Sequence, residues 1–115
     1  MSTINSTHIN TPTTVAFVAC WAALANGDDG APMSFAQYTD KSVQVVGTFG
    51  VGGSLSFEGS NDGVNWSVLT DPQGNALSFT SSKIKLVSEA TAFVRPHVTA
   101  GDGTTSLSVF ALLKE

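Results

Sequence analysis

Any catalytic centre in this chain would have to be built around His97, because the second histidine, His8, lies in a polar N-terminal stretch. His97 could act as general base for a serine nucleophile, with Asp102 orienting the imidazole ring. Serine is abundant, however, and no nucleophile-elbow sequence accompanies the histidine, so such a set arises by chance. The sequence therefore predicts a protein that is not an enzyme, with His97 partly buried or on the surface.

Acidic residues gather in three segments that could offer oxygen ligands to Ca²⁺, namely Asp28-Asp29, Asn61-Asp62 and Gly101-Asp102-Gly103. None of these segments has regularly spaced carboxylates, and aspartate beside glycine is what tight turns require. The glycines of residues 50–53 do not form a dinucleotide site either, since no helix is expected after them. We therefore expect no metal and no cofactor.

Three aromatic side chains could form a platform for a sugar ring. Trp66 is in phase with Val64 and Val68, which favours packing in the core. Trp21 lies next to a predicted loop and is the more plausible exposed ring, with Tyr38 as the third candidate.

These side chains must be positioned by strands, because residues 42–71 alternate apolar and polar types as three successive β-strands do. Asn61-Asp62-Gly63 predicts a hairpin turn, since Gly63 can adopt a positive φ. The residues that this alternation places on one face, with Trp66 in the core, are Val43, Val45, Gly47, Phe49, Leu55, Phe57, Val64, Trp66 and Val68.

Further short strands are expected on either side, at residues 14–24, 31–38, 76–80, 83–87, 91–99 and 104–113. In the strand at 83–87, Ile84 and Leu86 are expected to point inward and Lys83 and Lys85 outward. Pro96 cannot donate a ladder hydrogen bond, which places its strand at an edge or at a bend. Eight or nine short strands with glycine-rich turns predict an all-β, two-sheet β-sandwich of jelly-roll type.

The last strand is apolar on both faces. Its inward set is Leu107, Val109, Ala111 and Leu113, which leaves Phe110 and Leu112 on the outer face. An outer face of this kind is covered either by another part of the domain or by another subunit. Phe110 and Leu112 are therefore candidate partner-binding residues.

Residues 1–13 are rich in serine, threonine and asparagine and contain few apolar side chains. Such a segment does not bury enough apolar surface to order itself, so we expect a flexible N-terminal arm at residues 1–13 and a β-sandwich domain at 14–115. Ile4 and Ile9 are its apolar anchors and are also candidate partner-binding residues.

Composition narrows the class of partner. The chain has 115 residues, a formal net charge of −4 and only five lysines and arginines without a basic cluster, which argues against nucleic-acid binding. The apolar run at residues 15–25 is too short for a membrane span and no basic residue precedes it, so no membrane partner is expected. Cys20 is the only cysteine and is expected to be a buried thiol in a protein made in the cytoplasm.

Several motifs together resemble small virion proteins of tailed bacteriophages. They are Trp21 with Leu24-Ala25-Asn26-Gly27-Asp28 and Gly30, Ser42-Val43-Gln44-Val45, Gly47-Thr48-Phe49-Gly50, Glu58-Gly59-Ser60-Asn61-Asp62-Gly63, Asn65-Trp66, Arg95-Pro96 and Thr99-Ala100-Gly101-Asp102-Gly103-Thr104-Thr105. Within that group the chain is similar to capsid decoration (cement) proteins, which are β-sandwiches on the outside of the mature head.

The resemblance implies a non-enzymatic decoration protein that binds the major capsid protein on the outer capsid surface of the virion and stabilises the coat lattice. It also implies self-association, as a homotrimer that matches threefold lattice positions, with a dimer as the alternative. Residues 60–66 alone are similar to the hairpin of discoidin-type jelly rolls, so the alternative function is a carbohydrate- or receptor-binding module, with the tail as a candidate location.

Overall fold

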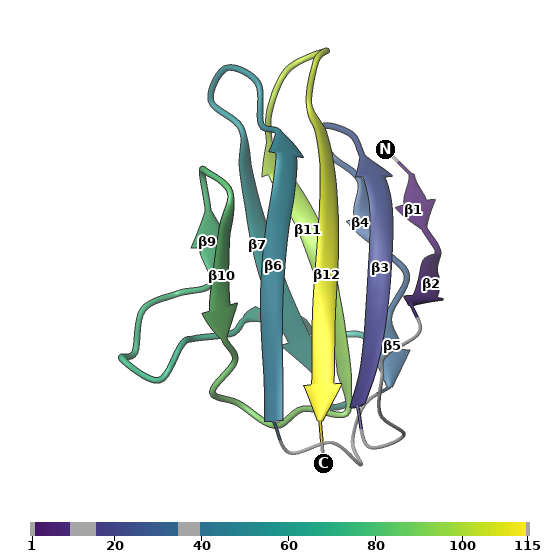
Figure 1. Ribbon diagram of the computed structural model, residues 1–115, viewed down its shortest axis with the longest axis vertical. Helices are drawn as coiled ribbons and strands as arrows, with labels where there is room; N and C mark the ends of the chain where they lie inside the picture. The colour runs from purple at the N-terminus through teal and green to yellow at the C-terminus, as the bar shows by residue number, and fades with distance from the viewer. Residues whose placement is uncertain (1, 10–15, 35–39, 115) are drawn as a thin grey trace.

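Two β-sheets stack face to face with an apolar core between them (Figure 1). The computed structural model describes residues 2–9, 16–34 and 40–114, and within these residues there are twelve strands and no helix. The predicted two-sheet β-sandwich is therefore confirmed, and its jelly-roll type stays a prediction.

The strands are short except for the central ones of each sheet. In sheet A the order is β1 (Thr3–Ile4), β4 (Asp29–Gly30), β11 (Phe93–Ala100), β7 (Ser54–Ser60) and β8 (Ser67–Val68), with β5 (Met33–Ser34) beside β11 and β9 (Ser78–Phe79) beside β7. In sheet B the order is β10 (Lys83–Leu86), β6 (Asp40–Thr48), β12 (Ser106–Lys114), β3 (Ala16–Leu24) and β2 (Ser6–Ile9).

The core is filled by alternate residues of the long strands, because successive side chains in a strand point to opposite faces. The inward set predicted for the last strand is confirmed, as are four of the residues predicted from residues 42–71. These buried side chains are Leu107, Val109, Ala111 and Leu113 of β12, Val43 and Val45 of β6, and Leu55 and Phe57 of β7.

The two tryptophans have the opposite environments to those predicted. Trp21 is fully buried, packs edge-to-face on Phe57 with ring centres 6.4 Å apart, and donates a 3.1 Å hydrogen bond from Nε1 to the carbonyl of Ala31. Trp66 lies half-buried in the loop that connects β7 to β8. The guanidinium carbon of Arg95 is 4.3 Å from its ring centre. The prediction failed because β8 is only two residues long, so the two-residue period does not continue through the loop before it.

Val64 and Val68, predicted on the same face as Trp66, are also not in the core. Val64 is 77% exposed and Val68 is 41% exposed. The hairpin itself is confirmed, since Glu58 pairs with Val68 and Gly59 with Ser67, and Gly63 has φ 76°.

The orientation predicted for β10 is also wrong. Ile84 and Leu86 are 64% and 58% exposed, whereas Lys85 reaches inward to Asp71, with Nζ 3.4 Å from Oδ2. The register explains the reversal: Lys83 and Lys85 pair with the inward Val45 and Val43, so they share the inward face. At the last strand of a sheet, a long lysine side chain on that face can still reach water.

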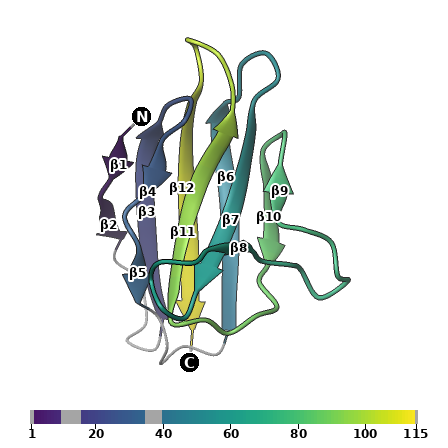
Figure 2. The ribbon, with the colours of Figure 1, turned by 180° about the vertical axis from the view of Figure 1, so that it is seen from behind.

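Pro96 lies inside sheet A, so of the two predicted possibilities, an edge or a bend, the edge position is wrong. Figure 2 shows β11 between β7 on one side and β4 and β5 on the other. Pro96 pairs with Phe57 of β7, while on the other side β5 pairs with Val94 and β4 with His97. Pro96 therefore faces the gap between β4 and β5, where no ladder hydrogen bond is required of its nitrogen.

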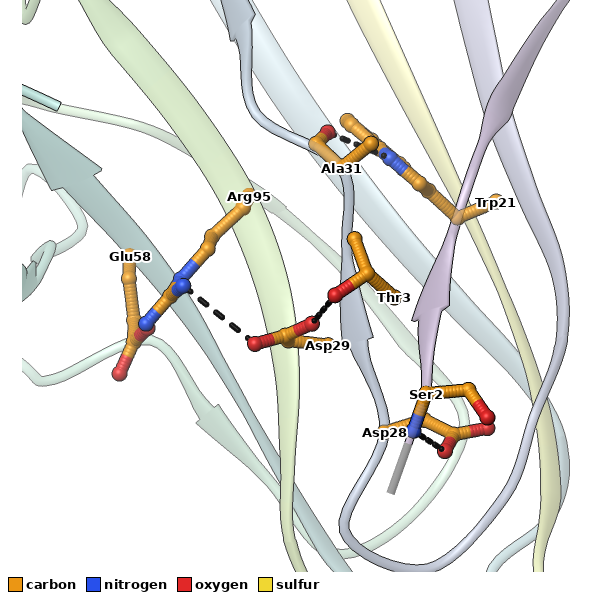
Figure 3. Close-up of polar contacts among 8 residues, drawn as sticks. All are labelled: Ser2, Thr3, Trp21, Asp28, Asp29, Ala31, Glu58 and Arg95. Carbon is orange, nitrogen blue, oxygen red and sulfur yellow. Dashed lines mark hydrogen bonds and ion pairs between the residues drawn. The ribbon is translucent and has the colours of Figure 1, made fainter.

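The N-terminal segment is paired with both sheets and is not a free arm over residues 2–9. β1 runs parallel to β4 and β2 runs antiparallel to β3, so the segment covers one side of the sandwich. The backbone N–H of Ser2 donates to Asp28 at 2.7 Å and Thr3 Oγ1 donates to Asp29 at 2.8 Å (Figure 3). Hydrogen bonds to the sheet edges thus order a segment with little apolar surface. The rest of the predicted arm, residues 10–13, lies outside the described part of the chain.

The β6–β7 and β11–β12 loops lie at the same end of the sandwich (Figure 1). Asp102 in the second loop joins them through a hydrogen bond. Its carboxylate accepts hydrogen bonds from the hydroxyl and backbone N–H of Thr104 and, at 2.8 Å, from the backbone N–H of Val51. These bonds, with the Thr104 hydroxyl first, lower the pKa of Asp102 to about 2.

We expect this link to weaken in acid. A carboxyl whose pKa is lowered by folding stabilises the native state above its ordinary pKa, and that contribution is lost as the pH falls towards about 2. Melting temperatures of the native chain and of Asp102→Asn should therefore differ more at about pH 5 than at about pH 2.5. An unchanged difference between the two pH values would show that the carboxylate has no stabilising role.

Candidate interaction surface

The outer face of sheet A is polar and charged. Arg95 lies between two carboxylates, with Nε 2.9 Å from Glu58 and Nη1 3.4 Å from Asp29 (Figure 3). The same guanidinium group covers the Trp66 ring. These charges are neutralised within the chain, and they tie β11, β7, β4 and the half-buried tryptophan together.

His97 does not meet Asp102, which lies in the loop beyond the end of β11. Its register partners are Asp29 on one side and Ser56 on the other, a row that has the residue types of a catalytic triad. The hydrogen bonds of a triad are missing: the Asp29 oxygens accept from Thr3 and Arg95, and among the described residues the buried Nδ1 of His97 has no partner.

The predicted turn role of the acidic segments is supported by their hydrogen bonds. Asp62 accepts from the backbone N–H groups of Asn65 and Val64 at 2.8 Å, and these bonds lower its pKa well below the usual range. Asp28 likewise accepts from the backbone of Ala25 at 2.9 Å. Within the described residues no group of three or more His, Cys, Asp or Glu side chains could hold a metal ion.

The outer face of sheet B is different, because apolar side chains from three strands meet there. The predicted outward position of Phe110 and Leu112 is confirmed: Phe110 is half-buried and Leu112 is 39% exposed, between the buried Val109, Ala111 and Leu113. We define the apolar face as Val18 of β3, Phe110 and Leu112 of β12, and Ile84 and Leu86 of β10.

Strand register places these residues in two rows across the sheet. One row runs Ile9, Val18, Leu112, Ser42 and Leu86. The next row runs Thr7, Cys20, Phe110, Gln44 and Ile84. Within these rows no residue carries a formal charge, and Cys20 is buried as predicted, which raises the pKa of its thiol.

Two shallow hollows continue the apolar face along β6 and β12. The larger has a volume of about 420 Å³ and is lined by Val18, Ser42, Gln44, Ile84, Phe110 and Leu112. The smaller, of about 230 Å³, is lined by Asp40, Lys41, Ser42, Leu86, Leu112 and Lys114. A surface of this shape and composition suits another macromolecule better than a polar solute.

The four residues predicted to bind a partner are not all on this surface. Ile9 is in register with Val18 and so falls in the same row as Leu112, whereas Ile4 packs against the core. The sequence analysis missed Val18, Ile84 and Leu86. For Val18 the signal was the alternation of its strand, which places it on the face opposite Ala19 and Trp21. For β10 only the pairing with β6 determines the outward face.

The fold and this surface define a small β-sandwich protein with one charged and one largely apolar outer face. No family model and no curated protein sequence matches the chain. Among solved structures, the SPBc2 prophage-derived protein YomS is similar, with a TM-score of 0.68 and 13% identity over 92% of this chain and 100% of that one. KdgF from Halomonas sp. is similar at a TM-score of 0.50 and 12% identity, over 96% and 77% of the two chains.

At these identities the likeness concerns the fold. The described residues contain no helix of the length and hydropathy needed to cross a bilayer.

Proposed function

We propose that this chain is a bacteriophage capsid decoration protein that binds the outer surface of the head, associates with itself and stabilises the coat lattice without catalysis. The observation that carries the proposal is the uncharged apolar face of sheet B, formed by Val18, Ile84, Leu86, Phe110 and Leu112. A face of this kind on a small protein is suited to contact with another protein.

Two further observations support a virion role. The fold is similar, over the full length of that chain, to a prophage-derived protein. The surface charges of sheet A are paired within the chain, so adhesion would rest on apolar contacts and neutral hydrogen bonds, which salt screens weakly.

The N-terminal segment offers a way to contact the coat that differs from a free arm. β1 and β2 are the outermost strands at the same side of sheets A and B, and among the described residues each pairs with the sandwich on one edge only. Their other edges are available to a strand of the major capsid protein, which could extend either sheet by backbone hydrogen bonds. Ile4 would stabilise this segment through the core, while Ile9 falls in the row of the apolar face.

The direct test is binding to heads. Purified protein added to heads of the parent phage that lack it should co-sediment with them, saturate at a fixed ratio to coat protein, and raise the temperature at which the heads disrupt. Absence of co-sedimentation would overturn the decoration proposal. Deletion of residues 1–9 is not a clean variant here, because it removes two strands from the folded sandwich.

A carbohydrate- or receptor-binding role is the second candidate, and Trp66 is the observation that favours it. Its half-buried ring lies against Arg95. Its chain neighbours Asn65 and Ser67 line a polar hollow of about 340 Å³. A partly exposed tryptophan combines an apolar ring with a polar N–H group, which suits it to binding contacts. Binding to host cells but not to heads would favour this function.

A further inference from the structure

We infer that the apolar face of sheet B pairs with the same face of a second copy about a twofold axis that runs parallel to the strands between β6 and β12. This inference deepens the self-association part of the proposed function by naming its surface and symmetry. The homotrimer expected from the resemblance would require a different contact.

The first argument is the contrast between the two outer faces. The charges on sheet A are engaged within the chain, through Arg95, Glu58 and Asp29. On sheet B, the two rows across the apolar face contain no formal charge. Two copies of sheet B can therefore approach without burying like charges against each other, which would be costly.

The second argument is the placement of the two charges at the end of this face. Asp40 and Lys114 are register partners on the adjacent strands β6 and β12. Both are exposed, and their neighbours Lys41 and Leu113 are buried, so Asp40 and Lys114 lie on the outer face. Neither takes part in the ion pairs formed among the described residues.

Rotation about a twofold axis between these strands places β6 of one copy over β12 of the other. The rotation does not change the position of a residue along the strand direction. Asp40 of one copy then lies over Lys114 of the other, and Lys114 over Asp40. By the same operation β10 of one copy lies over β3 of the other, which places Leu86 against Val18. Along the axis, the same rotation places Phe110 and Leu112 over Gln44 and Ser42 of the other copy. The face is thus complementary to itself in charge, with apolar contacts on its flanks, and each contact occurs twice, as an isologous interface requires.

The geometry and size are those of ordinary sheet packing. Strands of the two copies would be nearly aligned, as in the interior of a sandwich. Three strands of nine residues and two of four residues present roughly 550 Å² per copy at about 4.8 Å between strands. That area is near the lower limit of stable interfaces, so we expect dissociation in the micromolar range.

The test uses purified protein without heads, so that its failure and the failure of head binding are separate results. Sedimentation velocity from about 1 µM to about 200 µM should show a monomer–dimer equilibrium. Leu112→Lys should weaken dimerisation by roughly tenfold or more, because it buries a lysine without a partner. Val64→Lys, at an exposed valine in the β7–β8 loop, is the matched control and should dimerise as the native chain does.

The twofold geometry is tested by two charge reversals. Asp40→Lys and Lys114→Glu should each dimerise more weakly than the native chain, since each places like charges opposite one another. An equimolar mixture of the two variants should regain dimerisation as a heterodimer, because both contacts become attractive. We expect dimerisation to recover in the mixture only if residues 40 and 114 contact each other between copies.

Each other outcome overturns the inference. A monomer throughout the concentration range or a trimer excludes the twofold pair, and a dimer unaffected by Leu112→Lys excludes this face. If the mixture dimerises no better than either variant alone, the contact between Asp40 and Lys114 is excluded. Circular dichroism of every variant should match that of the native chain, which ensures that folded proteins are compared.

Discussion

Replacing Trp21 by alanine should lower the free energy of unfolding by about 3–5 kcal/mol, the largest single effect we expect in this protein. The ring is fully buried between the sheets, so its removal leaves a cavity beside Phe57. It also removes the Nε1–H donor to the carbonyl of Ala31. Urea unfolding followed by circular dichroism measures the effect without using tryptophan fluorescence.

Trp66→Ala is the matched control, since it removes the same side chain from a half-buried loop site. The loss of its contact with Arg95 is expected to cost about 0.5–1 kcal/mol, with a further contribution from partial burial. If the two substitutions were equally destabilising, the assignment of Trp21 as the core tryptophan would be contradicted.

Replacing Gly30 by alanine should lower the free energy of unfolding by about 1–3 kcal/mol, even though only one methyl group is added. A Cβ at this position would lie 2.5 Å from Pro96 Cδ and 2.7 Å from Trp21 Cδ1. Neither ring is a flexible chain end that can move aside. Gly30 also belongs to β4, which pairs with β1, so the N-terminal strand should become easier to proteolyse.

Gly103→Ala is the control for Gly30→Ala. A Cβ at Gly103 would have no atom within 4 Å, so its substitution should change stability by less than about 0.5 kcal/mol. Equal melting temperatures for both variants would show that the close approach of β4 to Pro96 and Trp21 is not required for stability.

The sequence was most informative where the periodicity of a single strand is sufficient. The inward residues of β12, the outward Phe110 and Leu112, the hairpin at Gly63 and the two-sheet sandwich all follow from alternation and turn chemistry. These features depend on residues within about ten positions of one another. The candidate surface was therefore predictable in part, through the two outer residues of the last strand.

The remainder of the surface and of the fold depends on contacts between segments distant in the sequence. Only the pairing of β10 with β6 shows that Ile84 and Leu86 face outward, because a shift of one residue in register reverses every side chain of a strand. Likewise, only the sheet order places Pro96 inside sheet A beside a gap between two short strands.

By itself, then, the sequence determined the longer strands, their turns and the class of fold, since these follow from local propensity and side-chain alternation. The tertiary structure alone decided which tryptophan is buried, how residues 2–9 are ordered and which side chains make up the apolar face. The physical reason is that burial and backbone pairing depend on what lies across the sheet. The N-terminal segment shows this directly: Asp28 and Asp29 satisfy its hydrogen-bonding groups from more than twenty residues away.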